Sequence, residues 1–385
     1  MVDQKYWLLP EGVDELLPPA ARELELLRRR VLDVFHAWGF EYVEPPIIEY
    51  LESLQVGSGS DLDLQTLKVI DQRTGRLLGV RADMTSQAAR IDAHSLQEDG
   101  VKRLCYAGTV VHANPVSVLE SRVPLKAGAE IFGSRSPSAD AEVVAMLVET
   151  LHEAGVSRPV LVLGHMGIYQ SLLATLNLPP QQAADLFAAV QRKSETDIAE
   201  LLGARAETAV MERLPTLMGR QEVFTEAREA LARAPTGVMD ALDALEQLAG
   251  MVHERCPEAE LRFDLSELAG YGYHNGPVFS AYQADQGSAV ARGGRYDGIG
   301  GAFGRARPAT GFDVNLKLLL TDAPAGAAVW VPAAAQASGF LEEVRALRLA
   351  GEVVICAVSI EEAPPPSCDR VLQKSADGWA VQPLT

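Results

Sequence analysis

Residues 103–111 read Arg-Leu-Cys-Tyr-Ala-Gly-Thr-Val-Val, residues 127–133 read Ala-Gly-Ala-Glu-Ile-Phe-Gly, and these two stretches set the fold class. The first is rich in β-branched and aromatic residues and the second alternates small and large ones, so we predict two strands. Further strands are predicted over 260–265, 277–284 and 287–292. Because these strands do not alternate strictly with helices, we expect an antiparallel sheet and the α+β class.

Helices are predicted before, between and after these strands. Residues 19–38 place apolar side chains at helical spacing, and residues 139–154 carry a valine and leucine stripe. The block 168–254 is dominated by alanine, leucine, glutamate and arginine, so we interpret it as a helical insertion. A further helix is expected over 311–321, and the glycine-rich stretch 293–304 is expected to form tight turns.

A smaller C-terminal piece follows a linker at 324–327. A strand over 328–332, a helix over 337–350 and a strand over 352–358 give a β-α-β pattern, and a hairpin is predicted near 369–382. The expected domains are a core of residues 1–165 and 256–322, a helical insertion of residues 166–255, and a C-terminal α/β domain of residues 323–385.

Composition narrows the function classes. The formal net charge of −18 weighs against nucleic acid as the main partner, because a negative chain repels phosphate backbones. The cysteines are scattered without a Cys-x-x-Cys pair, which suits a reduced cytosol and offers no zinc site. No stretch approaches the about 18 apolar residues that span a bilayer, and no signal-peptide pattern opens the chain. We expect a cytoplasmic protein without a membrane partner, metal or cofactor.

Generic catalytic motifs are absent from the sequence. It contains no P-loop, no Gly-x-Gly-x-x-Gly, no His-Glu-x-x-His and no Gly-x-Ser-x-Gly. The glycines of 293–304 are therefore not interpreted as a generic phosphate-binding loop.

Several segments, in a fixed order over roughly residues 10–320, resemble the catalytic core of histidyl-tRNA synthetase. Residues 10–18 are similar to that family's opening stretch and residues 39–46 to class II motif 1. The other similar segments are Val80–Thr85 in the histidine site, Tyr106–Val111 and Ala129–Gly133 at the ends of motif 2, Tyr271–Phe279 in the tyrosine-rich loop, and Gly293–Gly298 with Gly311–Phe312 before motif 3. The resemblance implies a class II aminoacyl-tRNA synthetase-like antiparallel sheet flanked by helices.

The departures from that family fall on its ATP-binding arginines. The arginines of motif 2, of the tyrosine-rich loop and of motif 3 fall on His112, Ala269 and Leu318. Adenylate formation needs fixed cations at the phosphate oxygens, and losing one such donor typically costs ~10²–10³ in rate. The resemblance therefore implies a chain without synthetase activity and with no catalytic residue.

The amino-acid pocket of the family is better preserved. Asp83 and Glu130 can accept an ammonium or an imidazole N–H, and Thr85 supplies a hydroxyl. Lys126 falls where the family has a glutamine, and Glu130 has an alternative structural role as a partner of Arg122 or Lys126. The candidate histidine-binding residues are Asp83, Thr85, Arg122, Lys126, Glu130, Tyr273, His274 and Tyr296.

The C-terminal piece lacks the features of an RNA-binding module. Residues 325–385 carry four basic and seven acidic residues, whereas RNA recognition needs cationic and stacking surface. A synthetase-like chain without ATP arginines or a competent anticodon domain resembles the regulatory subunit of ATP phosphoribosyltransferase, the first enzyme of histidine biosynthesis. The resemblance implies a short-form catalytic subunit as partner, histidine as effector, a homodimer within a larger hetero-oligomer, and no tRNA.

Two alternatives stay open at this point. A divergent histidyl-tRNA synthetase would place other cations at the phosphates, with Arg292, Arg305 and Arg307 as candidates. A ligand-free scaffold would only support the catalytic subunit. The preserved acids of the pocket argue against the scaffold.

Overall fold

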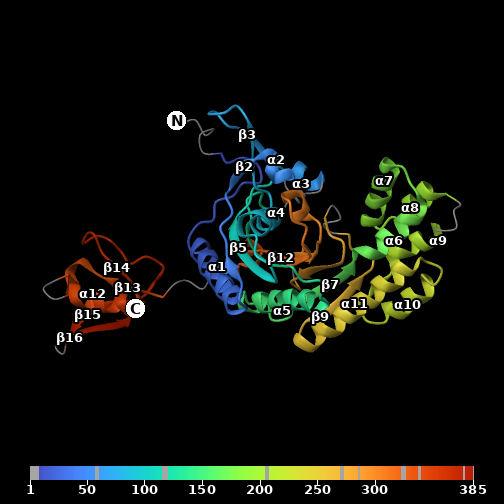
Figure 1. The fold of residues 1–385 in the computed structure, drawn as a ribbon. Coiled ribbons are helices and arrows are strands. Elements are labelled where there is room, and N and C mark those ends of the chain that lie inside the picture. Colours follow the sequence, from blue (N-terminus) through green and yellow to red (C-terminus); the bar gives the residue numbers. More distant parts are fainter. Residues whose placement is uncertain are drawn as a thin grey trace. The chain divides into compact units, whose positions relative to one another are not determined.

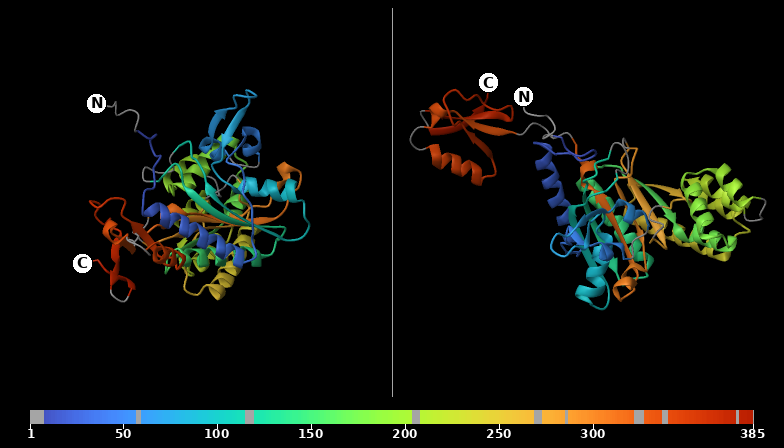
Figure 2. Two further views of the ribbon diagram at one scale, coloured as in Figure 1. Left: turned by 90° about the vertical axis from the view of Figure 1, so that its left-hand side faces the viewer. Right: turned by 90° about the horizontal axis from the view of Figure 1, so that it is seen from above.

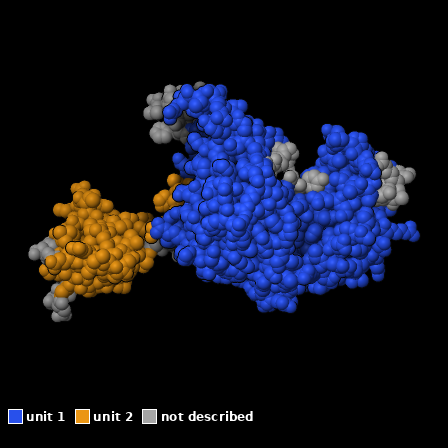
Figure 3. All heavy atoms as spheres, viewed as in Figure 1, with its two compact units in different colours: residues 1–15, 24–320 blue, residues 16–23, 321–385 orange. Residues whose placement is uncertain are grey.

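The computed structural model describes nine stretches of the chain, and contacts divide the protein into two compact units (Figure 3). The larger unit comprises residues 1–15 and 24–320, and the smaller comprises residues 16–23 and 321–385. The expected division of the larger unit into a core and a helical insertion stays a prediction. The described stretches are 8–56, 60–114, 120–203, 208–268, 273–284, 287–321, 327–336, 340–375 and 378–384.

The larger unit is built on a nine-stranded sheet in the order β1-β5-β6-β12-β11-β10-β7-β9-β8 (Figure 1). Neighbouring strands run antiparallel except for β1 with β5 and β7 with β9, which are parallel. The sheet is therefore mixed, with an antiparallel centre. Its strands are β1 (Glu41–Tyr42), β5 (Lys102–Thr109), β6 (Leu125–Phe132), β7 (Val160–His165), β8 (Met218–Gly219), β9 (Glu260–Asp264), β10 (Pro277–Tyr282), β11 (Ala291–Arg295) and β12 (Ala309–Asn315).

Long amphipathic helices pack against this sheet. The helices expected over 19–38 and 139–154 are confirmed as α1 (Ala20–Ala37) and α5 (Pro137–Glu153). Phe35 of α1 meets Phe312 of β12 edge to face, with ring centroids 5.8 Å apart. Burying such aromatic and aliphatic side chains supplies the main favourable free energy of folding.

Over its described residues, 168–203 and 208–254, the helical block is confirmed as a run of six helices interrupted by a 3₁₀ turn and the short strand β8. Strand β8 joins the central sheet beside β9, so the block is tied to the sheet at this point. The helices are α6 (Met166–Leu176), α7 (Pro180–Gln191), α8 (Glu195–Leu202), α9 (Thr208–Arg213), α10 (Val223–Ala230) and α11 (Thr236–Arg255).

Two expectations in this unit were wrong. Residues 311–321 form most of β12 and a 3₁₀ turn over Leu316–Leu319, because β12 pairs with β6 on one side and β11 on the other. The strand expected at 287–292 is shifted and runs over Ala291–Arg295, so Gly293 lies within a strand and not in a turn. A side chain at 293 would collide with Phe279, so close packing explains that glycine.

A separate three-stranded sheet, which the sequence did not indicate, precedes the helix α4 (Thr85–Arg90). Strand β4 (Leu77–Val80) lies between β2 (Ile48–Tyr50) and β3 (Leu67–Ile70), and both pairs are antiparallel. The short helices α2 (Leu51–Gln55) and α3 (Ser60–Gln65) connect β2 to β3.

The smaller unit has the expected β-α-β pattern followed by a hairpin (Figure 2). Its sheet has the order β14-β13-β15-β16, in which β13 is parallel to both neighbours and β15 and β16 are antiparallel. Residue Asp377 of the expected hairpin turn lies outside the described residues. The elements are β13 (Ala328–Val331), α12 (Phe340–Leu349), β14 (Val353–Cys356), β15 (Cys368–Ser375) and β16 (Gly378–Pro383).

Across the described residues, no helix combines the length and the apolar character that crossing a membrane requires.

Candidate functional site

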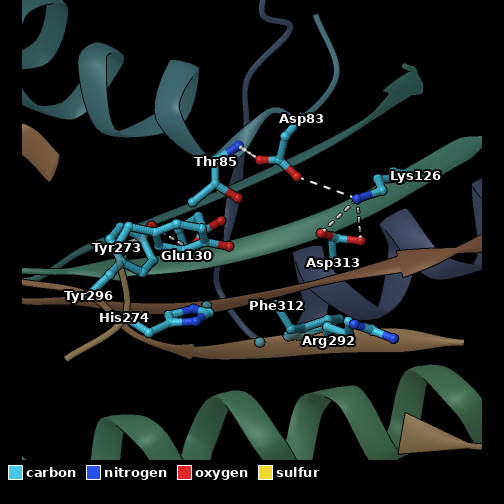
Figure 4. A pocket seen from close by; sticks show the side chains of 12 residues that line it. Asp83, Thr85, Lys126, Glu130, Tyr273, His274, Arg292, Tyr296, Phe312 and Asp313 are labelled. Carbon is cyan, nitrogen blue, oxygen red and sulfur yellow. Dashed lines mark hydrogen bonds and ion pairs between the residues drawn. The ribbon is translucent and has the colours of Figure 1, made fainter. Parts of the chain in front are cut away.

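A cavity of about 160 Å³ lies over the centre of the nine-stranded sheet, where β6, β12 and β11 are neighbours (Figure 4). Seven of the eight expected histidine-binding residues line it, and the exception is Arg122. The lining residues are Asp83, Thr85, Lys126, Glu130, Tyr273, His274, Arg292, Gly293, Tyr296, Gly311, Phe312 and Asp313.

Glu130 forms the inner end of the cavity. Its side chain is buried, and its two carboxylate oxygens accept hydrogen bonds from the hydroxyls of Tyr106 at 2.8 Å and Tyr296 at 2.6 Å. The rings of Tyr273 and His274 lie close by, with centroids 4.3 Å apart. This end offers a carboxyl group inside an aromatic wall, which suits a flat ring that carries polar N–H groups.

Glu130 pairs with neither Arg122 nor Lys126, so that structural alternative was wrong. Burial raises the pKa of Glu130 to about 8, although the two tyrosine hydrogen bonds act to lower it. Glu130 therefore carries a proton near neutral pH and can donate as well as accept. Burial also raises the pKa of Tyr106 and Tyr296 well above the usual range, so both hydroxyls stay protonated donors.

Tyr106 is a site residue that the sequence reasoning missed. It lies opposite Gly128 in the β5–β6 pair, and its ring occupies the space that a side chain at 128 would need. The available signal was a glycine facing a tyrosine across two expected strands, but this signal can be recognised only when the register of the strands is known.

Lys126 forms the outer end of the cavity together with two carboxylates. Its Nζ atom lies 3.0 Å from Oδ1 of Asp313 and 3.4 Å from Oδ2 of Asp83. The other oxygen of Asp83 accepts a 2.6 Å hydrogen bond from the backbone N–H of Thr85 at the start of α4. Asp313 was also missed, because the expected helix over 311–321 gave it no defined neighbour.

The two carboxyl groups at Lys126 respond to burial differently. Burial acts to raise the pKa of Asp83, but Lys126 and the Thr85 hydrogen bonds outweigh it, and the pKa is lowered overall. For Asp313 burial prevails, and its pKa is raised although Lys126 opposes the shift. Asp83 is thus the firmer negative charge of the pair, and it is the better acceptor for a ligand ammonium group.

Arg122 lies outside the cavity. Its Nε donates to the carbonyl of His112 at 2.9 Å, and its Nη1 donates to the carbonyl of Glu11 at 3.0 Å. The structure thus gives this guanidinium group a bracing role between segments, with no place on the cavity wall.

A second cavity of about 180 Å³ adjoins the first and shares Lys126, Arg292 and Asp313 with it. His112 and Leu318, two of the three positions at which the resembled family has arginines, both line this cavity. Ala269, the third, lies outside the described residues. Two of the three positions at which the resembled family has arginines therefore lie at the wall of one cavity.

His112 does not replace a permanent cation. Burial and the neighbouring Lys126 charge lower the pKa of its imidazole, so the ring is neutral near pH 7. Two of the three arginines considered as substitutes are occupied elsewhere: Arg305 binds Asp99 at 2.5 Å and Arg307 binds Asp92 at 2.6 Å. Neither lines the second cavity, whereas Arg292 does.

The mixed sheet and the pocket over its centre define a class II aminoacyl-tRNA synthetase-like protein. A family model described as histidyl-tRNA synthetase matches residues 12–319, and one described as ATP phosphoribosyltransferase subunit HisZ C-terminal domain matches residues 326–382. A structure titled as an ATP phosphoribosyltransferase regulatory subunit/histidyl-tRNA synthetase from Bacillus halodurans superposes with a TM-score of 0.82 at 26% identity, covering 94% of this chain and 96% of that one.

Curated relatives extend over nearly the whole chain. The ATP phosphoribosyltransferase regulatory subunit of Teredinibacter turnerae is 46% identical and covers 98% of both chains, and that of Thioalkalivibrio sulfidiphilus is 48% identical over all of both chains. This chain belongs to the family of ATP phosphoribosyltransferase regulatory subunits. The histidyl-tRNA synthetase of Nostoc shares the fold, with a TM-score of 0.78 at 18% identity over 96% of this chain and 92% of that one. The expected fold class and family are confirmed.

Replacing Glu130 with glutamine should flatten the pH dependence of stability. Because the pKa of Glu130 rises from 4.5 unfolded to about 8 folded, the folded state binds the extra proton between these values. The wild type should therefore lose stability as pH rises from 4.5 to 8, by up to ~1.4 kcal/mol per pH unit, and the variant should lose less. Urea unfolding at pH 6 and pH 8.5 measures this, with Glu226→Gln as the exposed control. If the free energy of unfolding depended on pH in the same way in the wild type and in Glu130→Gln, the raised pKa of Glu130 would be contradicted.

Proposed function

We propose that this chain is a non-catalytic regulatory subunit that activates a short ATP phosphoribosyltransferase catalytic subunit and conveys feedback inhibition by histidine. The observation that carries the proposal is the contrast between the two cavities. The first keeps an ordered set of amino-acid-binding groups, and the second has a neutral His112 and Leu318 where an ATP site needs cations.

Synthetase activity is proposed to be absent. Charge develops on the phosphate oxygens during adenylate formation, and preorganised cations must already face them. Neither leucine nor a neutral imidazole supplies the planar donor fork of an arginine. Among the described residues that line the second cavity, the cations are Arg292 and Lys126, and Lys126 is held by two carboxylates.

We propose one orientation for histidine in the first cavity. Its imidazole would lie at the Glu130 end among Tyr273, His274 and Tyr296, and its ammonium group would meet Asp83 and Thr85. Bound histidine would stabilise a less active arrangement of the complex, with a coupling of typically ~1–3 kcal/mol. Ligands of the catalytic subunit should then change histidine affinity by the same factor.

A homodimer of this chain is proposed within the larger hetero-oligomer. One face of the three-stranded sheet carries aliphatic side chains and one tyrosine, because the register places alternate residues of β2, β3 and β4 on the same side. Ile48 is 54% exposed and Val69 is 46% exposed on this face. Exposed apolar patches of this kind mark interfaces. The residues of the face are Ile48, Tyr50, Leu67, Val69, Leu78 and Val80.

Charge and the state of the cysteines support two further parts of the proposal, the absence of tRNA as a partner and the cytoplasmic location. The net charge of −18 and the acidic C-terminal piece support a function without tRNA. The four cysteines are free thiols, which supports a cytoplasmic location. Asp83, Thr85 and Glu130 form part of a polar pocket. A scaffold that only supports a partner subunit would not need such a pocket, so a ligand-free scaffold is disfavoured.

Asp83→Asn should weaken inhibition of the assembled enzyme by histidine. The change removes the negative charge facing the ligand ammonium but keeps the oxygen that accepts from Thr85. Losing one charged hydrogen bond of ~1.5–3 kcal/mol should raise the half-inhibitory histidine concentration by about 10- to 100-fold. Inhibition curves on the complex with the short catalytic subunit measure the shift, and Asp240→Asn, an exposed position of α11, is the control. An unchanged curve would remove Asp83 from the site, and a wild-type complex insensitive to histidine would refute feedback inhibition.

Val69→Lys should dissociate the homodimer, whereas Ile70→Lys should not. The two neighbours lie on opposite faces of β3, and only Val69 belongs to the apolar face. Burying an unpaired ammonium group at an interface costs several kcal/mol, so the dimer should weaken by at least about 100-fold. Sedimentation velocity over a concentration series separates the variants. Equal dimer stability in both would show that this face is not the interface.

A further inference from the structure

Arg292 of β11 is a cation at the boundary of the two cavities, and it lines both of them. Its side chain is exposed, and within the described stretches it makes no hydrogen bond and no ion pair. It lies opposite Asp313 in the β11–β12 pair, so both side chains project from the same face of the sheet. Figure 4 shows the guanidinium group on the side of Lys126 and Asp313, away from His274 and Glu130.

The other cations close to Arg292 in the sheet have partners. Lys126 bridges Asp83 and Asp313, which neutralises much of its charge. Arg295 of the same strand projects from the opposite face, where it is buried and binds Asp140 at 3.0 Å. Within the described part of the cavity wall, Arg292 is thus the cation that stays available to a ligand.

The pocket already holds complementary groups for two of the three polar parts of an amino acid with an imidazole side chain. Glu130 and the tyrosine hydroxyls face the ring position, and Asp83 with Thr85 faces the ammonium position. With the imidazole ring at the Glu130 end and the ammonium group at Asp83, the carboxylate on the same carbon as the ammonium group points toward the outer end of the cavity. Arg292 lies at that end.

We propose that Arg292 binds the carboxylate of the amino acid held in the first cavity and makes the pocket selective for the amino acid over its alcohol. This inference rests on the proposed function, because it names the group that completes recognition at the same site. A guanidinium fork matches a carboxylate with two parallel N–H···O bonds, a geometry that an ammonium group does not reproduce. The competing explanation is an ordinary solvated arginine that touches no ligand.

The test compares L-histidine with L-histidinol, in which a hydroxymethyl group replaces the carboxylate. Calorimetry on the full chain, alone and with the short catalytic subunit, gives both affinities for the wild type, Arg292→Gln and Arg292→Lys. The control is Arg30→Gln, because Arg30 is an exposed arginine of α1 that lines neither cavity. Unfolding midpoints of all variants establish that each chain is folded.

The wild type should bind histidine about 10- to 100-fold more tightly than histidinol. Arg292→Gln should lose this preference, with histidine weakened to the level of histidinol and histidinol changed by no more than about 2-fold. Arg292→Lys should retain part of the preference, and Arg30→Gln all of it. A preference that survives intact in Arg292→Gln overturns the inference while leaving the histidine pocket standing. A wild-type chain that binds neither molecule overturns the pocket and this inference together.

Discussion

The ammonium group of Lys126, held between Asp83 and Asp313, organises the charge of the whole site. It joins β6 to β12 and to the segment that begins α4, so three elements meet at one cation. It keeps Asp83 ionised, and it helps to keep His112 neutral on the side of the second cavity. The same charge therefore favours an ionised carboxylate in one cavity and disfavours an imidazolium in the other.

In the proposed function, a synthetase-like fold keeps the recognition of an amino acid and loses the activation chemistry. Binding an amino acid needs a shaped pocket with a few polar groups, and Glu130, Asp83 and Thr85 supply them. Activating that amino acid needs several fixed positive charges that face the phosphates of ATP. His112 and Leu318 lie at the wall of the second cavity, and neither supplies a fixed positive charge there. We propose that recognition of an amino acid then serves to control a partner subunit.

Much of the fold could be predicted from sequence because its signals are local. The helices over 20–37 and 137–153 follow from apolar spacing, and the C-terminal β-α-β pattern follows from strand composition and turns. The strand over 309–315 was mistaken for a helix, since its assignment depends on pairing with β6 and β11. The hairpin of β3 and β4 was missed because each strand has four residues, and Leu-Leu-Gly-Val of β4 shows no alternation of apolar and polar residues. Tyr106 and Asp313 were missed because their neighbours can be identified only when the strand register is known.

The measurement that tests this account most directly is histidine-dependent exchange of labelled pyrophosphate into ATP by the purified chain. The account predicts exchange no faster than the background without enzyme, in a sample that calorimetry shows to bind histidine. Exchange at the turnover rate of an active synthetase would contradict it, because the cavity with His112 and Leu318 would then have to grip ATP after all.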